Sequence, residues 1–110
     1  ILHYRRAENR LYTLRSGGIA LGMTDDVGSI FRERELPVSS GDLVLLYTDG
    51  VIEARNPEGE MFSLHRLEQF VREHWHLPAE SVRSELLESV DRFRRGREQA
   101  DDITILVMKF

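Results

Sequence analysis

The chain has 110 residues, of which 41% are hydrophobic and 31% are charged, and its formal net charge is −4. This composition is typical of a folded globular protein, and the acidic balance argues against a nucleic-acid-binding surface, which is normally basic. The longest apolar runs, 43–47 and 103–108, are far shorter than the ~20 residues of a membrane-spanning helix, so we expect no membrane span. The sequence has no cysteine, which excludes disulfides and thiolate metal sites and is consistent with a cytoplasmic location.

The first part of the chain predicts β-structure. Segments 1–6 and 10–14 alternate apolar and polar side chains on either side of a short polar turn, which predicts a β-hairpin. Segment 29–36 also alternates, and we expect it to form a surface or edge strand that ends at Pro37. The apolar run 43–47 lies between a Gly-Asp and an Asp-Gly pair, which is typical of a strand buried on both faces. We expect this core strand to pair antiparallel with the preceding one.

The second part predicts two consecutive helices followed by a strand. Asn-Pro-Glu-Gly at 56–59 is a strong turn signal. We expect Ser63 to be the N-cap of a helix over 64–74, because apolar residues recur there at helical spacing. A second helix is expected to start near Pro78, and segment 103–110 predicts a second buried strand. The second helix presents one apolar face, formed by Val82, Leu86, Val90 and Phe93. The order of elements predicts an α+β fold with mostly antiparallel strands.

Carboxylates stand at the ends of the two predicted core strands. Asp49 follows the strand at 43–47, and Asp101 and Asp102 precede the strand at 103–110. If these strands are antiparallel neighbours, the carboxylates meet at one edge of the sheet, where they require shared protons or a hard divalent cation. The alternative is that each acidic position only forms or caps a turn. The residues alone leave both interpretations open.

Three other patterns favour ordinary structure over a binding site. The adjacent acids at 25–26 lie in a stretch rich in Gly, Ser and Thr, where such acids are usually solvated. His65, His74 and His76 suggest a zinc site as an alternative, but His74 and His76 are two residues apart near a helix end and so point to different faces. The basic residues at 92–97 complement the dipole at the end of the second helix, so we interpret them as a solvated helix terminus.

Two stretches together resemble a known family. GDLVLLYTDGVIEARN (41–56), followed at a distance by ADDITILVMKF (100–110), closely resembles the C-terminal half of the metal-dependent serine/threonine phosphatases of the 2C type. The similarity is to the bacterial branch related to stage II sporulation protein E and the sigma-B regulatory phosphatases, and it covers essentially the whole chain. It implies that residues 1–110 are the C-terminal part of an α-β-β-α phosphatase sandwich.

The resemblance also implies roles for individual residues. Asp49 and Asp101 match the aspartates that carry the binuclear Mn²⁺/Mg²⁺ site of the family, whereas Asp102 matches a position where relatives have Asn or Asp. Glu53 lies in a segment that couples regulation to the metal site in the bacterial branch, so we expect it to support the site without binding metal. In the family mechanism, the two ions activate a water that attacks phosphorus in line.

A substrate and a setting follow from the same resemblance. The substrate is expected to be phosphoserine or phosphothreonine on a small regulatory protein, such as an anti-sigma-factor antagonist. A sensor or receiver domain is expected upstream. The alternative is a non-catalytic phosphatase-like module that regulates a protein partner by binding it.

The sequence departs from the family at two points. The family's first metal-binding Asp-Gly motif falls before Ile1, and the chain starts without an initiator Met. We therefore expect a piece of a longer protein, with little or no phosphatase activity by itself. Ser63 stands after Phe62 where relatives often have Gly, which we expect to affect only the helix start. Half of a sandwich would also expose apolar surface, so self-association of the isolated piece is a further expectation.

Overall fold

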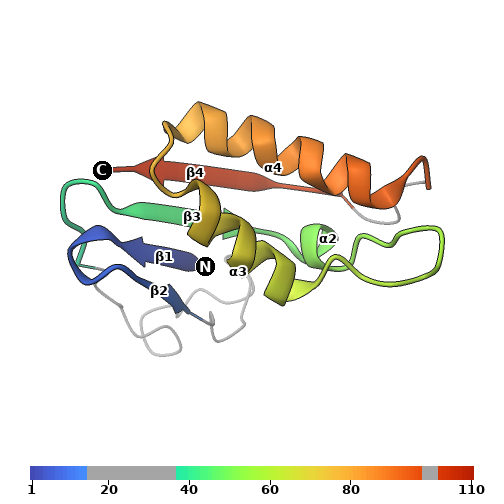
Figure 1. The fold of residues 1–110 in the computed structure, drawn as a ribbon, viewed down its shortest axis with the longest axis horizontal. Coiled ribbons are helices and arrows are strands. Elements are labelled where there is room, and N and C mark those ends of the chain that lie inside the picture. Colours follow the sequence, from blue (N-terminus) through green and yellow to red (C-terminus); the bar gives the residue numbers. More distant parts are fainter. Residues whose placement is uncertain (15–36, 98–101) are drawn as a thin grey trace, which may run out of the picture.

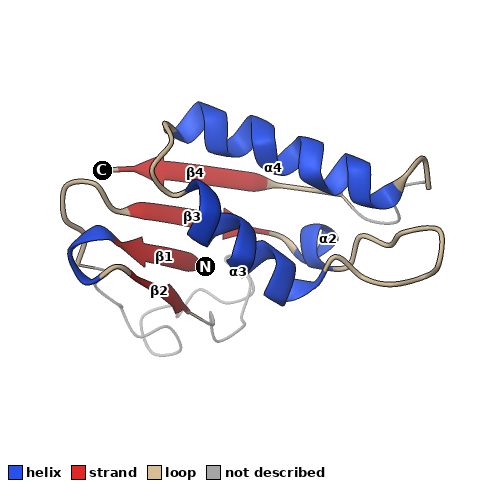
Figure 2. Ribbon diagram, in the orientation of Figure 1, coloured by secondary structure: helices blue, strands red, loops and turns tan. Residues whose placement is uncertain are grey.

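The computed structural model describes residues 1–14, 37–97 and 102–110. Within these residues, four strands form one antiparallel sheet in the order β2-β1-β3-β4. Helices α3 and α4 both lie over the same face of this sheet (Figure 1). The predicted α+β class, with two consecutive helices before the last strand, is confirmed (Figure 2). The strand predicted at 29–36 and its pairing lie outside the described residues.

The first two strands form the predicted hairpin. β1 (Leu2–Arg5) and β2 (Arg10–Thr13) pair antiparallel, with a short 3-10 turn, η1 (Arg6–Glu8), between them. Asn9 closes this turn with a left-handed backbone (φ 50°), a conformation that Asn tolerates better than most residues. The Tyr4 hydroxyl donates a hydrogen bond to the Asn9 side chain. The turn is therefore fixed by both the backbone and a side chain.

β3 (Leu43–Tyr47) is the predicted core strand and lies between β1 and β4. Its register places Leu45 opposite Leu2 of β1 and opposite Val107 of β4. The first three residues of β3 are buried, whereas the last two are half-buried. The predicted burial on both faces therefore holds for the first part of the strand only.

β4 (Ile105–Lys109) is shorter and more exposed than the strand predicted at 103–110. It is the edge strand of the described sheet, because β3 is its one neighbour there. Ile105 and Val107 pack against the core, so the alternation of a strand directs Leu106 to the opposite face, where it is 54% exposed. The prediction of a fully buried strand is therefore wrong for β4. An apolar run covered on one face has the same composition as a run covered on both.

The two long helices form where the apolar spacing predicted them. They are α3 (Ser63–His74) and α4 (Ala79–Arg94), which Pro78 directly precedes. Each buries one apolar stripe against the sheet: Leu67, Phe70 and Val71 from α3, and Val82, Leu86 and Val90 from α4. In the described part of the chain, none of the helices is both long and apolar enough to cross a membrane.

Ser63 is not the N-cap that the sequence predicts. It is the first residue of α3, Phe62 precedes it, and no side chain caps this end of the helix. The φ angle of Ser63 is 74°, in the left-handed region that glycine adopts most easily. The position is thus defined by its backbone conformation and not by a capping hydroxyl.

Lys109 ties the end of β4 to the end of α3. Its Nζ donates to the carbonyl oxygen of Gly41 (3.1 Å) and to that of Trp75, and it lies 5.1 Å from the centroid of the Trp75 ring. Burial lowers the pKa of Lys109 below its ordinary value, and the nearby Arg6 adds to this effect. Lys109 nevertheless supplies a donor to the Trp75 carbonyl, and the last carbonyls of a helix lack partners within the helix.

Candidate active site

Asp49 stands at the exit of the central strand. Thr48 follows β3 with an extended backbone, and Asp49 begins the one-turn helix α2 (Asp49–Ile52). Two backbone hydrogen bonds hold this turn, from the Val51 amide to the Thr48 carbonyl (3.1 Å) and from the Glu53 amide to the Asp49 carbonyl (2.9 Å). Val51 is fully buried, whereas Asp49 is exposed. A packed backbone therefore presents a carboxylate to solvent.

The turn interpretation of Asp49 is correct for its backbone, which does enter a helical turn. Its carboxylate, however, makes no hydrogen bond or ion pair with any of the residues that the structure describes. The turn is held by main-chain bonds and by burial of Gly50 and Val51. Among the described residues, the side chain of Asp49 therefore makes no contact that holds the turn.

The entrance of β4 lies beside the exit of β3. The Thr48 amide donates to the Thr104 carbonyl (3.1 Å), and the Thr104 amide donates to the Thr48 hydroxyl (3.0 Å). The same hydroxyl donates to the carbonyl of Asp102 (3.3 Å). β3 and β4 are therefore antiparallel neighbours, as the prediction of converging carboxylates requires. Asp49 and Asp102 lie at the same end of the sheet, while Asp101 is outside the described residues and its role stays a prediction.

Two carboxylates, Glu68 and Asp49, act on Tyr47 at this end of the sheet. Burial raises the pKa of the Tyr47 phenol above its ordinary value, and the charges of Glu68 and Asp49 raise it further. Tyr47 therefore stays protonated at neutral pH and adds no charge of its own. Glu53, at the end of α2, is exposed and adds a second carboxylate to the same segment.

The chemistry of the donor atoms suits a hard divalent cation. The chain has no cysteine, and the described groups at this strand exit include the Asp49 carboxylate, the Thr48 hydroxyl and the Asp102 carbonyl, which are oxygen donors of the kind that Mn²⁺ and Mg²⁺ prefer. Within residues 1–14, 37–97 and 102–110, no three His, Asp or Glu side chains lie close enough to hold a metal ion. Asp49 therefore fits as one ligand, and it does not complete a metal site with its described neighbours.

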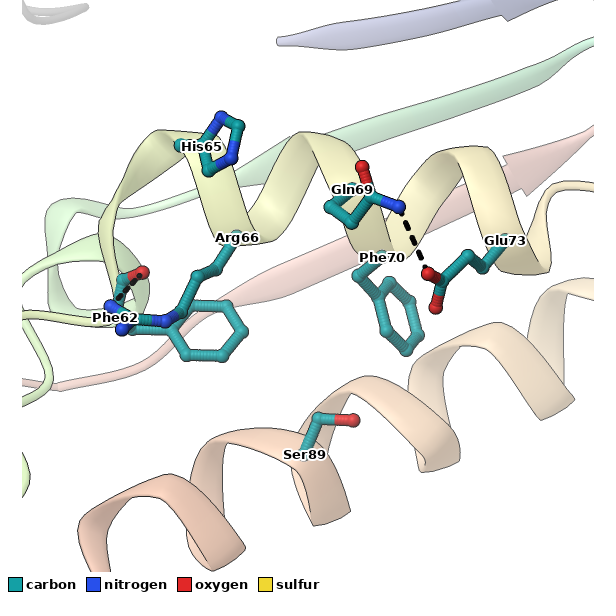
Figure 3. A pocket seen from close by; sticks show the side chains of 7 residues that line it. All are labelled: Phe62, His65, Arg66, Gln69, Phe70, Glu73 and Ser89. Atoms are coloured by element: carbon teal, nitrogen blue, oxygen red, sulfur yellow. Dashed lines mark hydrogen bonds between the residues drawn. The ribbon is translucent and has the colours of Figure 1, made fainter.

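The three histidines of the alternative zinc site, His65, His74 and His76, lie in separate surroundings. Nδ1 of His74 lies 2.8 Å from the Phe70 carbonyl oxygen, and the two rings stack. His76 packs edge-on against Trp75, and His65 lines a groove between α3 and α4 (Figure 3). Among the residues placed by the structure, these histidines do not come together as metal ligands.

The groove between α3 and α4 has a volume of about 320 Å³. Seven side chains line it (Figure 3): Phe62, His65, Arg66, Gln69, Phe70, Glu73 and Ser89. Three of its polar side chains are engaged, since Gln69 donates to Glu73 (2.9 Å) and Arg66 donates to the Met61 carbonyl (2.6 Å). The lining includes no residue of β3, α2 or β4, so the groove is separate from the candidate active site.

The loop between α2 and α3 contacts the end of α4. The turn predicted at 56–59 is confirmed, because the Gly59 amide donates to the carbonyl of Asn56 (2.9 Å). Asn56 is buried, with 4% of its surface exposed. Nη1 of Arg97 donates to the same carbonyl (3.0 Å), and Arg95 lies 3.3 Å from the carboxylate of Glu58. The basic end of α4 is therefore only partly the solvated terminus that the sequence indicates.

Sequence reasoning missed two polar contacts near the strands. One is the hydroxyl bridge from Thr48, and the other is a buried contact between His3 and Asp42 (2.9 Å). A Thr before Asp-Gly at a strand exit is the local signal for the first. The second depends on the pairing of β1 with β3, for which no local signal exists.

The sheet, the two helices on one face and the exposed aspartate at a strand exit define the class of protein. Part of the solved SiaA-PP2C domain of Pseudomonas aeruginosa has the same arrangement, with a TM-score of 0.79 and 24% sequence identity. The alignment covers 99% of this chain and 42% of that chain. The chain therefore has the fold of a 2C-type phosphatase.

The sequence belongs to a particular branch of that class. The model of the stage II sporulation protein E (SpoIIE) family matches residues 1–110, so the chain is a member of this family. Protein IcfG of Synechocystis sp. is 31% identical over 105 residues, which cover 93% of this chain and 16% of that protein. Phosphoserine phosphatase RsbU of Bacillus subtilis is 24% identical over 107 residues, which cover 97% of this chain and 31% of that protein. The chain thus spans less than a third of each of these two relatives. The family that the sequence resembles is confirmed by the match over residues 1–110.

Proposed function

We propose that the protein containing this sequence is a metal-dependent phosphatase that hydrolyses phosphoserine or phosphothreonine on a regulatory partner protein. The observation that carries this proposal is the exposed carboxylate of Asp49, held at the exit of β3 beside the entrance of β4. Two further aspartates, Asp101 and Asp102, immediately precede that entrance in the sequence. Membership of the SpoIIE family and the similarity to phosphoserine phosphatase RsbU support the same reaction class.

We assign metal binding to Asp49 and Asp101, with Mn²⁺ or Mg²⁺ as the ion. When bound, a binuclear centre would supply an activated water and would offset the negative charge of the phosphoryl group. Asp49 suits this role because its backbone is fixed by the buried Val51, while its side chain is exposed among the described residues. Glu53, exposed at the end of α2, is assigned a supporting role.

The substrate and the setting are part of the proposal. We propose a small phosphorylated regulatory protein as the substrate, such as an anti-sigma-factor antagonist, in the cytoplasm. We also propose that an upstream sensor or receiver domain controls the activity. We assign residues 1–110 to the C-terminal part of the phosphatase domain. They align with 42% of the SiaA-PP2C chain, which supports the assignment to part of a domain.

Phosphatase assays of the full-length protein and of residues 1–110 test the proposal. With Mn²⁺ and a small aryl phosphate, the full-length protein should turn over, and Asp49→Asn should abolish turnover. Asp91→Asn is the matched control, because Asp91 is an exposed carboxylate on α4 that pairs with Arg94. Residues 1–110 alone should show no turnover. Turnover by residues 1–110 that Asp49→Asn removes would contradict the assignment of further metal ligands to preceding sequence.

The same assay distinguishes the non-catalytic alternative. If the full-length protein binds a phosphorylated partner but never releases phosphate with Mn²⁺ or Mg²⁺, the domain serves binding and the phosphatase proposal fails. A metal titration that leaves the thermal stability of the full-length protein unchanged at millimolar Mn²⁺ would also count against ligation by Asp49.

A further inference from the structure

We propose that Thr48 is a positioning residue for the metal site, which it sets by holding the entrance of β4 against the backbone that carries Asp49. This inference rests on the proposed function, because it assumes that Asp49 and Asp101 bind metal. It adds a residue to which the ligand assignment gives no role.

The Thr48 hydroxyl joins two strands through one atom. It accepts a hydrogen bond from the Thr104 amide (3.0 Å) and donates one to the Asp102 carbonyl (3.3 Å). The Thr48 amide adds a third bond, to the Thr104 carbonyl (3.1 Å). The entrance of β4 is therefore fixed on both sides of Ile103 by a residue of the other strand.

The two bonded segments are those that carry the assigned ligands. Thr48 directly precedes Asp49, and Asp102 directly follows Asp101. The bridge therefore acts on the residue next to each assigned ligand in the sequence. The hydroxyl bridge thus holds the backbone at Asp102 and Thr104 against the backbone that leads into Asp49, and Thr48 itself is given no metal contact.

The hydroxyl is the part of the Thr48 side chain that forms the bridge. A hydroxyl donates and accepts at once, whereas Val has the same shape but neither capacity. Ser retains the hydroxyl and loses only the methyl group. The side chain of Thr48 is exposed, so the substitutions leave no cavity in the core. The three residue types therefore separate the hydrogen bonds from packing.

The test is a Mn²⁺ titration of the full-length protein, with free Mn²⁺ followed by electron paramagnetic resonance. Loss of residues that orient metal ligands typically weakens affinity about 10- to 100-fold, so we expect at least a ~10-fold weaker Kd for Thr48→Val. Thr48→Ser should stay within about twofold of the unsubstituted protein, because it keeps the bridge. If Thr48→Val does not fold, Thr48→Ala is measured against the same criterion.

Thr13→Val is the matched control for lost hydrogen bonding. Thr13 of β2 is also exposed, and its hydroxyl donates to Glu68 of α3 (2.8 Å). β2 lies two strands away from β3 in the sheet. Thr13→Val should leave the Mn²⁺ affinity unchanged. Equal Mn²⁺ affinity in Thr48→Val and Thr13→Val would overturn the inference.

Asp49→Asn separates this inference from the function on which it rests. If Asp49→Asn weakens Mn²⁺ binding and Thr48→Val does not, only the positioning role fails. If Asp49→Asn leaves Mn²⁺ binding unchanged, the assigned metal site fails, and the positioning role fails with it.

Discussion

Nε2 of His3 lies 2.9 Å from Oδ2 of Asp42, and these two residues are only 2% and 1% exposed. The backbone amides of Arg6 and Ser39 donate to the same carboxylate, and each donor–acceptor distance is 3.0 Å. An ionised carboxylate only accepts hydrogen bonds, so Nε2 of His3 carries a proton in this contact. One buried side chain thereby joins β1, the turn after it and the segment that leads into β3.

We expect acid to destabilise the protein through Asp42. Burial alone would raise the pKa of Asp42, but hydrogen bonds from His3 and from two backbone amides outweigh it and lower the pKa below its ordinary value. A carboxyl with a lowered folded-state pKa adds stability above its unfolded pKa of about 4 and loses it as the pH falls through the folded pKa. Urea unfolding at pH values from 7 to 3 should therefore show a falling free energy of unfolding below about pH 4.

Asp42→Asn identifies the source of this pH dependence. At pH 7 it should lower the free energy of unfolding by about 2 kcal/mol, because buried donors lose a charged acceptor. Its stability should then fall less steeply in acid than that of the unsubstituted protein. Asp91→Asn, at an exposed carboxylate, should leave the profile unchanged. Parallel acid profiles for Asp42→Asn and the unsubstituted protein would show that another group is responsible.

We expect Ser63→Gly to stabilise the protein. Ser63 begins α3 at φ 74°, where a Cβ atom costs about 1–2 kcal/mol. Because Gly also loses more freedom on folding, the net gain in the free energy of unfolding should be about 1 kcal/mol or less, seen as a higher urea midpoint. Ser63→Ala keeps the Cβ and should give no gain. An equal gain in Ser63→Ala would assign the effect to the hydroxyl and not to the backbone.

We expect Arg97 to contribute more to stability than its neighbour Arg95. Arg97 donates to the carbonyl of the buried Asn56, and its removal should lower the free energy of unfolding by about 1 kcal/mol. The ion pair of Arg95 with Glu58 joins side chains that are 62% and 54% exposed, and such pairs contribute about 0–1 kcal/mol. Chemical denaturation of Arg97→Gln and Arg95→Gln makes the comparison. A larger loss in Arg95→Gln would contradict it.

We expect the exposed apolar face of β4 to promote self-association of residues 1–110. Leu106 is 54% exposed, so Leu106→Glu should change the free energy of unfolding by about 0.5 kcal/mol or less. It should also lower the apparent mass at high protein concentration, measured by light scattering after gel filtration. Leu87→Glu, at the 36% exposed Leu87 of α4, controls for added charge on the helix side of the sheet. The same decrease in both variants would remove the special role of β4.

The helices and β3 could be predicted from the sequence because their signals are local. Apolar spacing in α3 and α4 records which side faces the sheet, and the Asp-Gly pair after β3 marks where that strand ends. The edge position of β4 could not be predicted in the same way. Edge and central strands of similar composition differ only in their neighbours, and neighbours are a property of the whole fold.

The candidate site shows the same division. Asp49 could be proposed as a site residue from its place after a core strand, and its location at the same end of the sheet as Asp102 could be stated only as a condition on strand order. The bridge through Thr48 and the burial of Asp42 could not be predicted, because each depends on residues that come together only when strands pair. The backbone conformation of Ser63 could not be predicted either, because serine is common at helix N-caps and here adopts a left-handed φ.

The contact between Thr48 and Asp102 also bears on how the protein folds. The two residues are 54 positions apart in the sequence, and both long helices lie between them. Contacts of such high sequence separation form slowly, because loop-closure entropy opposes them until other packing is in place. We therefore expect this end of the sheet to be among the last parts to become ordered during folding. Partly folded chains with formed helices would then lack a functional site.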